Sequence, residues 1–568
     1  MQDAMNWLAR DPDPRTREEL QHLIDQRMND EISDRFIQRL EFGTAGLRGK
    51  VGCGPNRMNR LVIQETATGL GHYLIEHIAN ACLRGVVVGY DGRLDSKQFA
   101  IDTASVLTAL GIKVYLTANV AATPIVAFGI KHFNAAAAVV VTASHNPPEY
   151  NGFKVYWENG AQIIPPHDTG IANEIDIAST KPIPLMSLCD AEKQGKLVWL
   201  TEGYYQTYRA AINQSRYVNH SIESANTTIT YTAMHGVGAQ MAEDLLHDAG
   251  FHKVFSVPEQ REPDGHFPTV NFPNPEEQGA MDLVVNLAKK VDADIACAND
   301  PDADRFAVAV RTKDRSYKML TGDQVGVLFA HYLLSQPHSK KPLVGNSIVS
   351  STLLEKVAQS HGATYFQTLT GFKWLANIGM QLEDENSEFL FAYEEALGYT
   401  IGTQVRDKDG LSALVIFAQL VEELKSQGQT VWDLLAQISF EHGVHTNAQR
   451  SIALAPDSPS IGSKLRAEQP KKIDGMAISV IEDLQSSLRF IVGGNTETIH
   501  LPTSDVLIYH LADGSRIIVR PSGTEPKVKV YYETVTKYEG TETYEDTRLR
   551  GELHMEKLIE QHQKELNS

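Results

Sequence analysis

The stretch Ala135-Ala136-Ala137-Ala138-Val139-Val140-Val141-Thr142-Ala143-Ser144-His145-Asn146-Pro147 is an unbroken apolar run followed directly by polar residues. Small and β-branched apolar side chains in a continuous run are typical of a strand that is buried on both faces of a parallel sheet. Ser144 therefore stands just beyond the carboxyl end of such a strand, where open α/β sheets place the groups that bind ligands. A single serine in this position is more often a turn or helix-capping residue, so the rest of the chain decides its role.

Ser144 and His145 do not form a hydrolase motif in the sequence. Adjacent side chains on an extended segment point apart, so we do not expect a serine–histidine dyad here. The G-x-S-x-G pattern of α/β-hydrolases is also missing around Ser144. A hydroxyl at this position can instead carry a group that is transferred.

Apolar strands and helical patterns alternate on both sides of this stretch. A strand over 85–90 ends in the turn Asp91-Gly92-Arg93, and a helix over about 97–110 follows. The alternation restarts near 227 and again near 318, which predicts mostly parallel sheets covered by helices. Residues 1–41 form a helical extension, for which Thr16 and Glu19 predict a capping box.

The breaks in this alternation predict four domains, because a chain of 568 residues is too long for one core. From 446 onward the pattern changes to an α+β unit that ends in a polar helix over 550–566. We place the four domains at 1–205, 206–317, 318–445 and 446–568.

The composition is that of a soluble globular protein, with 42% apolar and 22% charged residues. The formal charge of −19 argues against nucleic acids and anionic membranes as main partners. No apolar run is long enough to cross a bilayer, and the N-terminus has no secretory signal. The cysteines are scattered without metal spacing, as in reduced cytosolic proteins. We therefore expect a cytoplasmic protein without nucleic-acid or membrane partners.

Three carboxylates follow another expected strand, over 294–298, in the segment Asp300-Pro301-Asp302-Ala303-Asp304-Arg305. Oxygen ligands at alternate positions of a loop can converge on one hard cation such as Mg²⁺ or Mn²⁺. The segment is not an EF-hand, because Arg305 stands where that loop needs glycine and Arg311 where it needs glutamate. A solvated acidic turn remains the alternative.

Two further loops carry groups suited to a phosphorylated sugar. In Arg520-Pro521-Ser522-Gly523-Thr524-Glu525-Pro526, an arginine, two hydroxyls and a glycine can form an oxyanion cradle. In Tyr393-Glu394-Glu395-Ala396-Leu397-Gly398, a glutamate can accept two sugar hydroxyls, and the nearby Lys408 can bind an anion or move a proton. Taken alone, each loop is as consistent with an exposed turn. The sequence contains neither a Walker A loop nor a complete dinucleotide-binding glycine motif.

Together, these four segments resemble the α-D-phosphohexomutase family, which includes phosphoglucomutases, phosphomannomutases and phosphopentomutases. The family's serine motif, T-A-S-H-N-P, stands at 142–147 and its metal loop, D-x-D-x-D-R, at 300–305. Its sugar loop resembles 394–398 and its phosphate loop 520–526, in the family's order along nearly the whole chain. The resemblance implies four domains around a central cleft: three similar mixed α/β sheets with covering helices, then a C-terminal α+β domain.

The resemblance also assigns roles to single residues. Ser144 matches the serine that is phosphorylated, in a first domain that carries the N-terminal helical extension. One Mg²⁺ per chain is implied, with Ser144, Asp300, Asp302 and Asp304 as its ligands. The other residues that match catalytic positions are Arg48, His145, Lys154 and Lys408. Those that match substrate-binding positions are Thr370, Gly371, Glu394, Ala396, Arg520, Ser522, Gly523 and Thr524.

The implied activity is a phosphosugar mutase, an intramolecular phosphotransferase that converts a hexose 1-phosphate to its 6-phosphate through phosphoserine and a bisphosphorylated sugar. We expect glucose as the hexose, a sugar bisphosphate as activator, and a monomer or weak homodimer. Pentose and mannose phosphates stay open, since many members have serine where this chain has Ala396. The segment 154–160 also looks closer to the branch that includes phosphopentomutases.

Two other classes of function are weaker. A non-catalytic phosphosugar-binding protein would need a broken motif, and all four are intact. A phosphatase that uses Asp302 as nucleophile would need D-x-D-x-[TV], but Arg305 and Phe306 follow Asp304.

Overall fold

The computed structural model describes residues 1–43, 46–453, 461–521 and 527–567. Three residues of the expected phosphate cradle, Ser522, Gly523 and Thr524, lie outside the described residues. The chain divides into two compact units. The first comprises 1–322, 372–381 and 389–427, and the second comprises 323–371, 382–388 and 428–568.

The first sheet of the first unit is built around the apolar run 135–141, which precedes Ser144. The predicted strand is present as β4, every residue of which is buried, and it ends at Val141. The sheet has the order β1-β5-β4-β2-β3-β6, and β4 runs parallel to β2 and antiparallel to β5. The strands are β1 (Leu47–Lys50), β2 (Val86–Tyr90), β3 (Val114–Thr117), β4 (Ala137–Val141), β5 (Tyr150–Trp157) and β6 (Leu197–Leu200). The helices are α4 (Arg60–His77), α5 (Ala81–Arg84), α6 (Ser96–Ala109), α7 (Thr123–Phe133), α8 (His167–Ser179), α9 (Leu188–Lys193) and α10 (Glu202–Asn213).

The N-terminal extension forms three helices, α1 (Gln2–Arg10), α2 (Pro14–Asp25) and α3 (Asn29–Phe36), which share the hydrophobic core of the first sheet. Buried Glu65 of α4 pairs with Arg10 at 2.7 Å and with Arg39 at 2.5 Å. The predicted capping box at Thr16 is wrong. Asp13 caps α2 instead, because Pro14 is already pre-set for the first helical position, and Thr16 donates to Asp11.

The second sheet has the order β11-β10-β9-β7-β8. Strand β9 runs parallel to β7 and antiparallel to β10, so the three aspartates lie in the short connection between β9 and β10. Its strands and helices are β7 (Ile229–Thr232), α11 (Ala239–Asp248), β8 (Val254–Ser256), α12 (Pro258–Arg261), α13 (Asp282–Val291), β9 (Ile295–Asn299), β10 (Phe306–Arg311) and β11 (Tyr317–Met319). The remaining elements of this unit are α16 (Phe372–Leu382), β14 (Ser387–Glu394), β15 (Gly398–Ile401) and α17 (Gly410–Ser426).

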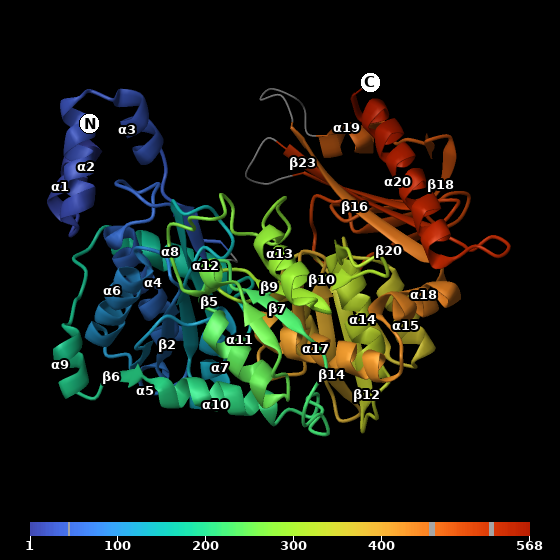
Figure 1. Cartoon of the computed structure of the whole chain (residues 1–568). Coiled ribbons are helices and arrows are strands. Elements are labelled where there is room, and N and C mark those ends of the chain that lie inside the picture. The colour runs from blue at the N-terminus through green and yellow to red at the C-terminus, as the bar shows by residue number, and fades with distance from the viewer. Residues whose placement is uncertain (44–45, 454–460, 522–526, 568) are drawn as a thin grey trace. The chain divides into compact units, whose positions relative to one another are not determined.

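The second unit contains a parallel pair of strands, β12 (Lys341–Ser347) and β13 (Thr364–Thr368), with α14 (Gly322–Leu334) and α15 (Leu353–Ser360). It continues into a larger, antiparallel sheet, along whose strands β16 and β23 the helix α20 lies (Figure 1). The strands are β16 (Val444–Ala453), β17 (Lys472–Ile473), β18 (Met476–Asp483), β19 (Leu488–Ile491), β20 (Thr496–Thr498), β21 (Leu507–Leu511), β22 (Arg516–Pro521) and β23 (Lys527–Thr536). The helices are α18 (Val431–His442), α19 (Ile461–Ala467) and α20 (Tyr544–Asn567).

The C-terminal part of the chain is the α+β unit that the sequence predicts, and its polar terminal helix begins a few residues earlier than expected, at Tyr544. Among the described residues, no helix is long and apolar enough to span a membrane.

Candidate functional site

Ser144 lies directly after β4 in a backbone conformation that is uncommon for a side-chain-bearing residue. Its φ is 51°, in the left-handed region, and its side chain is buried with 3% of the residue exposed. The Ser144 amide donates to Thr142 Oγ1 at 2.8 Å, which holds the turn. Because such a backbone costs about 1–2 kcal/mol for a non-glycine residue, surrounding contacts must hold it in place.

This turn also brings the Ser144 Oγ within 3.1 Å of His145 Nδ1. The prediction that these two side chains point apart is therefore wrong. It assumed an extended segment, whereas the left-handed Ser144 folds the chain back on itself. Burial, followed by the charges of Arg305 and Arg48, lowers the pKa of His145 well below its ordinary value, so this imidazole is neutral at pH 7.

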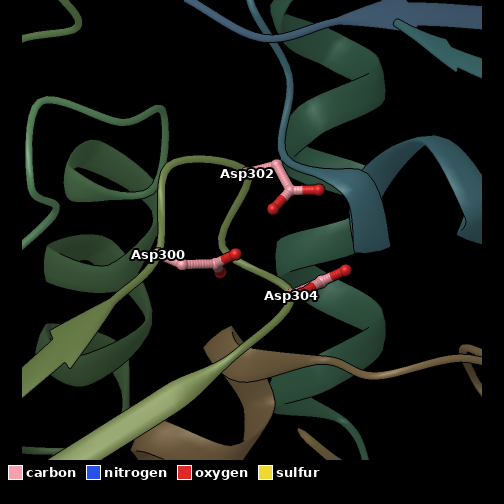
Figure 2. Close-up of side chains that lie close together, drawn as sticks. All are labelled: Asp300, Asp302 and Asp304. Atoms are coloured by element: carbon pink, nitrogen blue, oxygen red, sulfur yellow. The ribbon is translucent and has the colours of Figure 1, made fainter. Parts of the chain in front are cut away.

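The three aspartates lie together on the loop between β9 and β10, as Figure 2 shows. Asp300, Asp302 and Asp304 are each at most 1% exposed, and an oxygen from each lies within 4.8 Å of the others. Ser144 Oγ donates to Asp300 Oδ2 at 2.6 Å, although the two residues are 156 positions apart in the sequence. The structure thus joins the serine motif of the first sheet to the carboxylate loop of the second.

Two lysines counter the charge of this loop. Lys154 on β5 lies 2.7 Å from Asp302 Oδ2 and 2.9 Å from Asp304 Oδ2. Lys408, between β15 and α17, lies 3.3 Å from Asp304 Oδ2. Burial disfavours both ammonium groups, but the neighbouring aspartates outweigh it and raise the pKa of each lysine. Both lysines are therefore cations in this arrangement.

The carboxylates respond to burial and to these lysines in opposite ways. Burial, and then repulsion from Asp302 and Asp304, raises the pKa of Asp300 well above its ordinary value. Burial also acts on Asp302 and Asp304, but Lys154 near both carboxylates and Lys408 near Asp304 outweigh it, so the pKa of each is lowered. Asp300 is thus the member of the cluster whose charge most needs a further cation nearby.

The cluster fits a hard divalent cation. Asp302 Oδ1 and Asp304 Oδ1 are buried and, within the part of the chain that the structure describes, accept no hydrogen bond. A buried carboxylate oxygen without a partner is costly unless it binds a donor or an ion. An all-oxygen set of three carboxylates and a hydroxyl suits Mg²⁺ or Mn²⁺ rather than zinc or copper.

Arg305 ends the D-x-D-x-D-R motif, and the sequence predicts no role for it. In the structure it connects this loop to the segment 394–398. Its amide donates to Asp300 Oδ1 at 3.0 Å, and its Nη1 donates to the carbonyl of Ala396 at 3.0 Å. The Phe306 amide donates to the Leu397 carbonyl at 3.1 Å. Ala396 therefore lies in a β14–β15 turn that is hydrogen-bonded to the aspartate loop, and Glu394 is the last residue of the strand that leads into this turn.

The remaining predicted site residues fall into two groups. Arg48 lies on β1, and its Nη1 donates to the Asn146 side chain at 3.1 Å, beside the Ser144 turn. Thr370 and Gly371 follow β13, and Arg520 lies near the end of β22, all within the second unit. Gly371 has a φ of 112°, which favours glycine at that turn.

Sequence reasoning missed Thr123, at the start of α7. Its hydroxyl donates to Asp302 Oδ2 at 2.6 Å, and its amide donates to the Asp302 carbonyl at 2.9 Å. Thr123 is fully buried and lies 179 positions from Asp302 in the sequence. The only signal in the sequence is that Thr123 precedes Pro124, which indicates the start of a helix but not a contact with Asp302.

We predict that Thr123→Val weakens Mg²⁺ activation about 10- to 100-fold, the usual effect of losing a hydrogen bond that orients a metal ligand. Valine keeps the shape of threonine but leaves the Asp302 carboxylate with Lys154 as its remaining partner, so the orientation of the carboxylate is less fixed. Titrating activity with Mg²⁺ measures the change, and Thr103→Val is a matched control, because its hydroxyl is also buried but donates to the Phe99 carbonyl within α6. Equal Mg²⁺ requirements in the two variants would contradict the prediction.

A buried hydroxyl held beside an all-oxygen carboxylate cluster and two lysine cations, at the ends of α/β strands, is suited to phosphoryl transfer. The chain matches the phosphoglucomutase/phosphomannomutase models for α/β/α domain I over 39–181, domain II over 204–313 and domain III over 321–439. It also matches the model for the C-terminal domain over 464–549. The protein belongs to the phosphoglucomutase/phosphomannomutase family and is a sugar-phosphate mutase. The resemblance to α-D-phosphohexomutases and the implied fold class, three mixed α/β domains and a C-terminal sheet-rich domain, are confirmed.

Relatives that match this chain over nearly its whole length are named as different enzymes. The chain is 35% identical to human phosphopentomutase, over 94% of this chain and 91% of that protein. It is 32% identical to human glucose 1,6-bisphosphate synthase, over 94% and 90%. The fold is shared with the open form of the phosphoglucomutase parafusin from Paramecium, with a TM-score of 0.66 and 19% identity over 92% of this chain and 96% of that one.

Proposed function

We propose that Ser144 carries the phosphoryl group that this mutase transfers. The observation that supports this role most directly is the 2.6 Å hydrogen bond from Ser144 Oγ to Asp300 Oδ2 in a buried cluster. A hydroxyl in that place puts a phosphoryl group next to the three carboxylates and within reach of Lys154 and His145. Such a position is suited to a covalent carrier, because phosphoryl transfer depends on positioning and on charge stabilisation.

In the first transfer, the phosphorus–oxygen bond to Ser144 Oγ breaks and a new bond forms to a free hydroxyl of the sugar phosphate. The proton of that hydroxyl passes to Ser144 Oγ, and neutral His145, 3.1 Å away, is placed to relay it. The bisphosphorylated sugar then turns over and returns its other phosphoryl group to Ser144. The net change moves phosphate from the 1-position to the 6-position of a hexose, or to the 5-position of a pentose.

The charged residues divide the remaining work. Lys154 and Lys408 hold the ionised Asp302 and Asp304 in place. Arg48, which donates to the side chain of Asn146 beside Ser144, would bind a phosphate oxygen. Asp300, Asp302 and Asp304, with an oxygen on Ser144, would hold one Mg²⁺, which when bound neutralises charge on the transferring group. A sugar bisphosphate would act as activator by phosphorylating Ser144.

The substrate's other phosphate would be held by Arg520, Ser522, Gly523 and Thr524, and its sugar by Thr370, Gly371, Glu394 and Ala396. We propose glucose phosphate as a substrate, in line with the phosphoglucomutase resemblance. A pentose phosphate is the second candidate, because human phosphopentomutase matches this chain nearly end to end and Ala396 removes a hydroxyl that many members of the family place in the sugar loop.

One experiment tests both parts of the proposal. Wild-type protein treated with sugar bisphosphate and Mg²⁺ should gain a single phosphoryl group of about 80 Da on Ser144 and lose it to a sugar monophosphate. The protein is then assayed side by side on glucose, mannose, ribose and deoxyribose 1-phosphates. Absence of any adduct, together with turnover, would contradict the phosphoserine mechanism.

Ala396→Ser should shift the preference toward hexoses. We expect kcat/KM on glucose 1-phosphate to rise several-fold relative to ribose 1-phosphate, since one neutral hydrogen bond contributes about 0.5–1.5 kcal/mol. The pentose reaction of the same variant is the internal control. An equal change on both sugars would show that the Ala396 position does not select the substrate.

A further inference from the structure

Arg93 stands in the turn that follows β2, next to the Ser144 segment. The sequence marks this residue only as the end of an Asp91-Gly92-Arg93 turn. In the structure its side chain is buried, with 4% of the residue exposed. A guanidinium has five N–H donors, and burying them without partners is costly. The contacts of Arg93 therefore identify the part of the structure that this side chain stabilises.

Most hydrogen-bond partners of Arg93 are main-chain carbonyls of the segment 144–150, which begins with the turn at Ser144. Its Nη2 donates to the carbonyls of Ser144 at 2.8 Å and Asn146 at 2.5 Å. Its Nη1 donates to the carbonyls of Pro147 at 2.8 Å and Tyr150 at 2.9 Å. One planar group therefore holds three carbonyls of the connection between β4 and β5 and a fourth on Tyr150, the first residue of β5.

The guanidinium is itself fixed from two sides. Its Nε faces the buried carboxylate of Asp91 at 3.3 Å, and the Asp91 Oδ1 accepts from the Arg93 amide at 3.0 Å. The ring of Phe267, from the loop between α12 and α13, lies 5.0 Å from the guanidinium carbon. The four N–H groups on Nη1 and Nη2 thus donate to carbonyls, while Nε only faces the Asp91 carboxylate as an ion pair, and little freedom is left to the group.

We propose that Arg93 is a positioning residue for the phosphoryl group carried by Ser144, an inference that rests on the proposed phosphoserine mechanism. The left-handed Ser144 backbone would relax toward an ordinary conformation if its carbonyl and those that follow were released. Relaxation would move Ser144 Oγ away from Asp300 and the reacting sugar hydroxyl. A displacement of about 1 Å at a reacting atom can cost on the order of 100-fold in rate.

Lysine cannot replace arginine in this role. Its ammonium group has three donors at a single point, whereas the guanidinium spreads five donors over a plane. Arg93→Lys keeps the charge but leaves at least one of the four carbonyls without its donor. The substitution therefore separates the geometric effect of Arg93 from the effect of its charge.

Arg84, whose contacts lie just before the first residue of β4, provides a matched control. Arg84 donates through Nε to the Asn134 carbonyl at 2.9 Å and through Nη2 to the Ala135 carbonyl at 3.2 Å, just before β4. Like Arg93, it donates to main-chain carbonyls next to β4, but at the end of the strand that lies away from Ser144. Arg84→Lys should therefore affect stability alone.

The test compares Arg93→Lys with Arg84→Lys at a temperature well below the Tm of both variants. We expect kcat of Arg93→Lys to fall about 100-fold, KM to stay within a few-fold, and the rate of Ser144 phosphorylation by sugar bisphosphate to fall in parallel with kcat. Arg84→Lys should keep the wild-type kcat. A kcat for Arg93→Lys near the wild-type value, or equal losses in the two variants, would overturn the inference.

Two further measurements keep the result interpretable. If Arg93→Lys does not fold, Asp91→Asn removes the charge that fixes the guanidinium and so weakens its hold on the four carbonyls. This variant should lower kcat several-fold at constant KM, and an unchanged kcat would overturn the inference. Wild-type protein in the same assay shows whether Ser144 is phosphorylated at all. An absent wild-type adduct contradicts the proposed function, whereas a normal adduct with an unaffected Arg93→Lys contradicts only the role of Arg93.

Discussion

Ser144→Ala is expected to abolish sugar-phosphate turnover. Removing the covalent nucleophile from an enzyme whose other groups stay in place costs on the order of a million-fold in kcat. Alanine tolerates the same left-handed backbone about as well as serine, so the turn held by Thr142 and Arg93 should persist. What disappears is the oxygen that accepts the phosphoryl group, together with its hydrogen bonds to Asp300 and His145.

The measurement is conversion of glucose 1-phosphate and ribose 1-phosphate in the presence of Mg²⁺ and a trace of the matching bisphosphate, combined with intact mass. Ser105→Ala is the matched control, because the Ser105 hydroxyl donates to the Met186 carbonyl at 2.7 Å within the same domain rather than to a group of the cluster. Turnover by Ser144→Ala at the rate of the control, or a phosphoryl adduct on the variant, would exclude Ser144 as the carrier.

Asp302→Asn should produce the second largest loss, about 1000-fold in kcat, since charge stabilisation by a bound divalent cation contributes several kcal/mol to such reactions. The neutral amide removes one of the three carboxylates and also takes from Lys154 its 2.7 Å partner. Lys154 still has Asp304 at 2.9 Å, so the fold of the loop should survive. Excess Mg²⁺ should restore part of the activity, because the two remaining carboxylates still attract the ion.

The Mg²⁺ dependence of kcat separates this effect from general damage. Asp409→Asn is a suitable control: Asp409 is also a buried aspartate, but it caps α17 and accepts from Tyr208 at 2.9 Å. Its requirement for Mg²⁺ should equal that of the wild type. Full activity of the wild-type protein in EDTA, or an Asp302→Asn variant whose loss is independent of Mg²⁺, would contradict the assignment of the cluster as a cation site.

Much of the local structure follows from short-range sequence patterns. The apolar run before Thr142 predicts β4, and the run before Asp300 predicts β9, because a strand buried on both faces must be apolar at every position. The polar periodicity near the C-terminus predicts α20. The predicted capping box at Thr16 fails for a local reason, since Asp13 and Pro14 compete for the helix start and are the stronger signal.

The sequence by itself determined which residue types are available and where strands end, because backbone propensity and burial act over a few neighbours. Only the tertiary structure decided that Ser144 meets Asp300, that Lys154 and Thr123 hold Asp302, and that Arg93 holds the Ser144 turn. These three partners of Asp300 and Asp302 come from the first sheet and its helices, 148 to 179 positions away, so no local pattern reports them. The fold had to place the ends of β4 and β9 together before these charges and hydroxyls could act on one another.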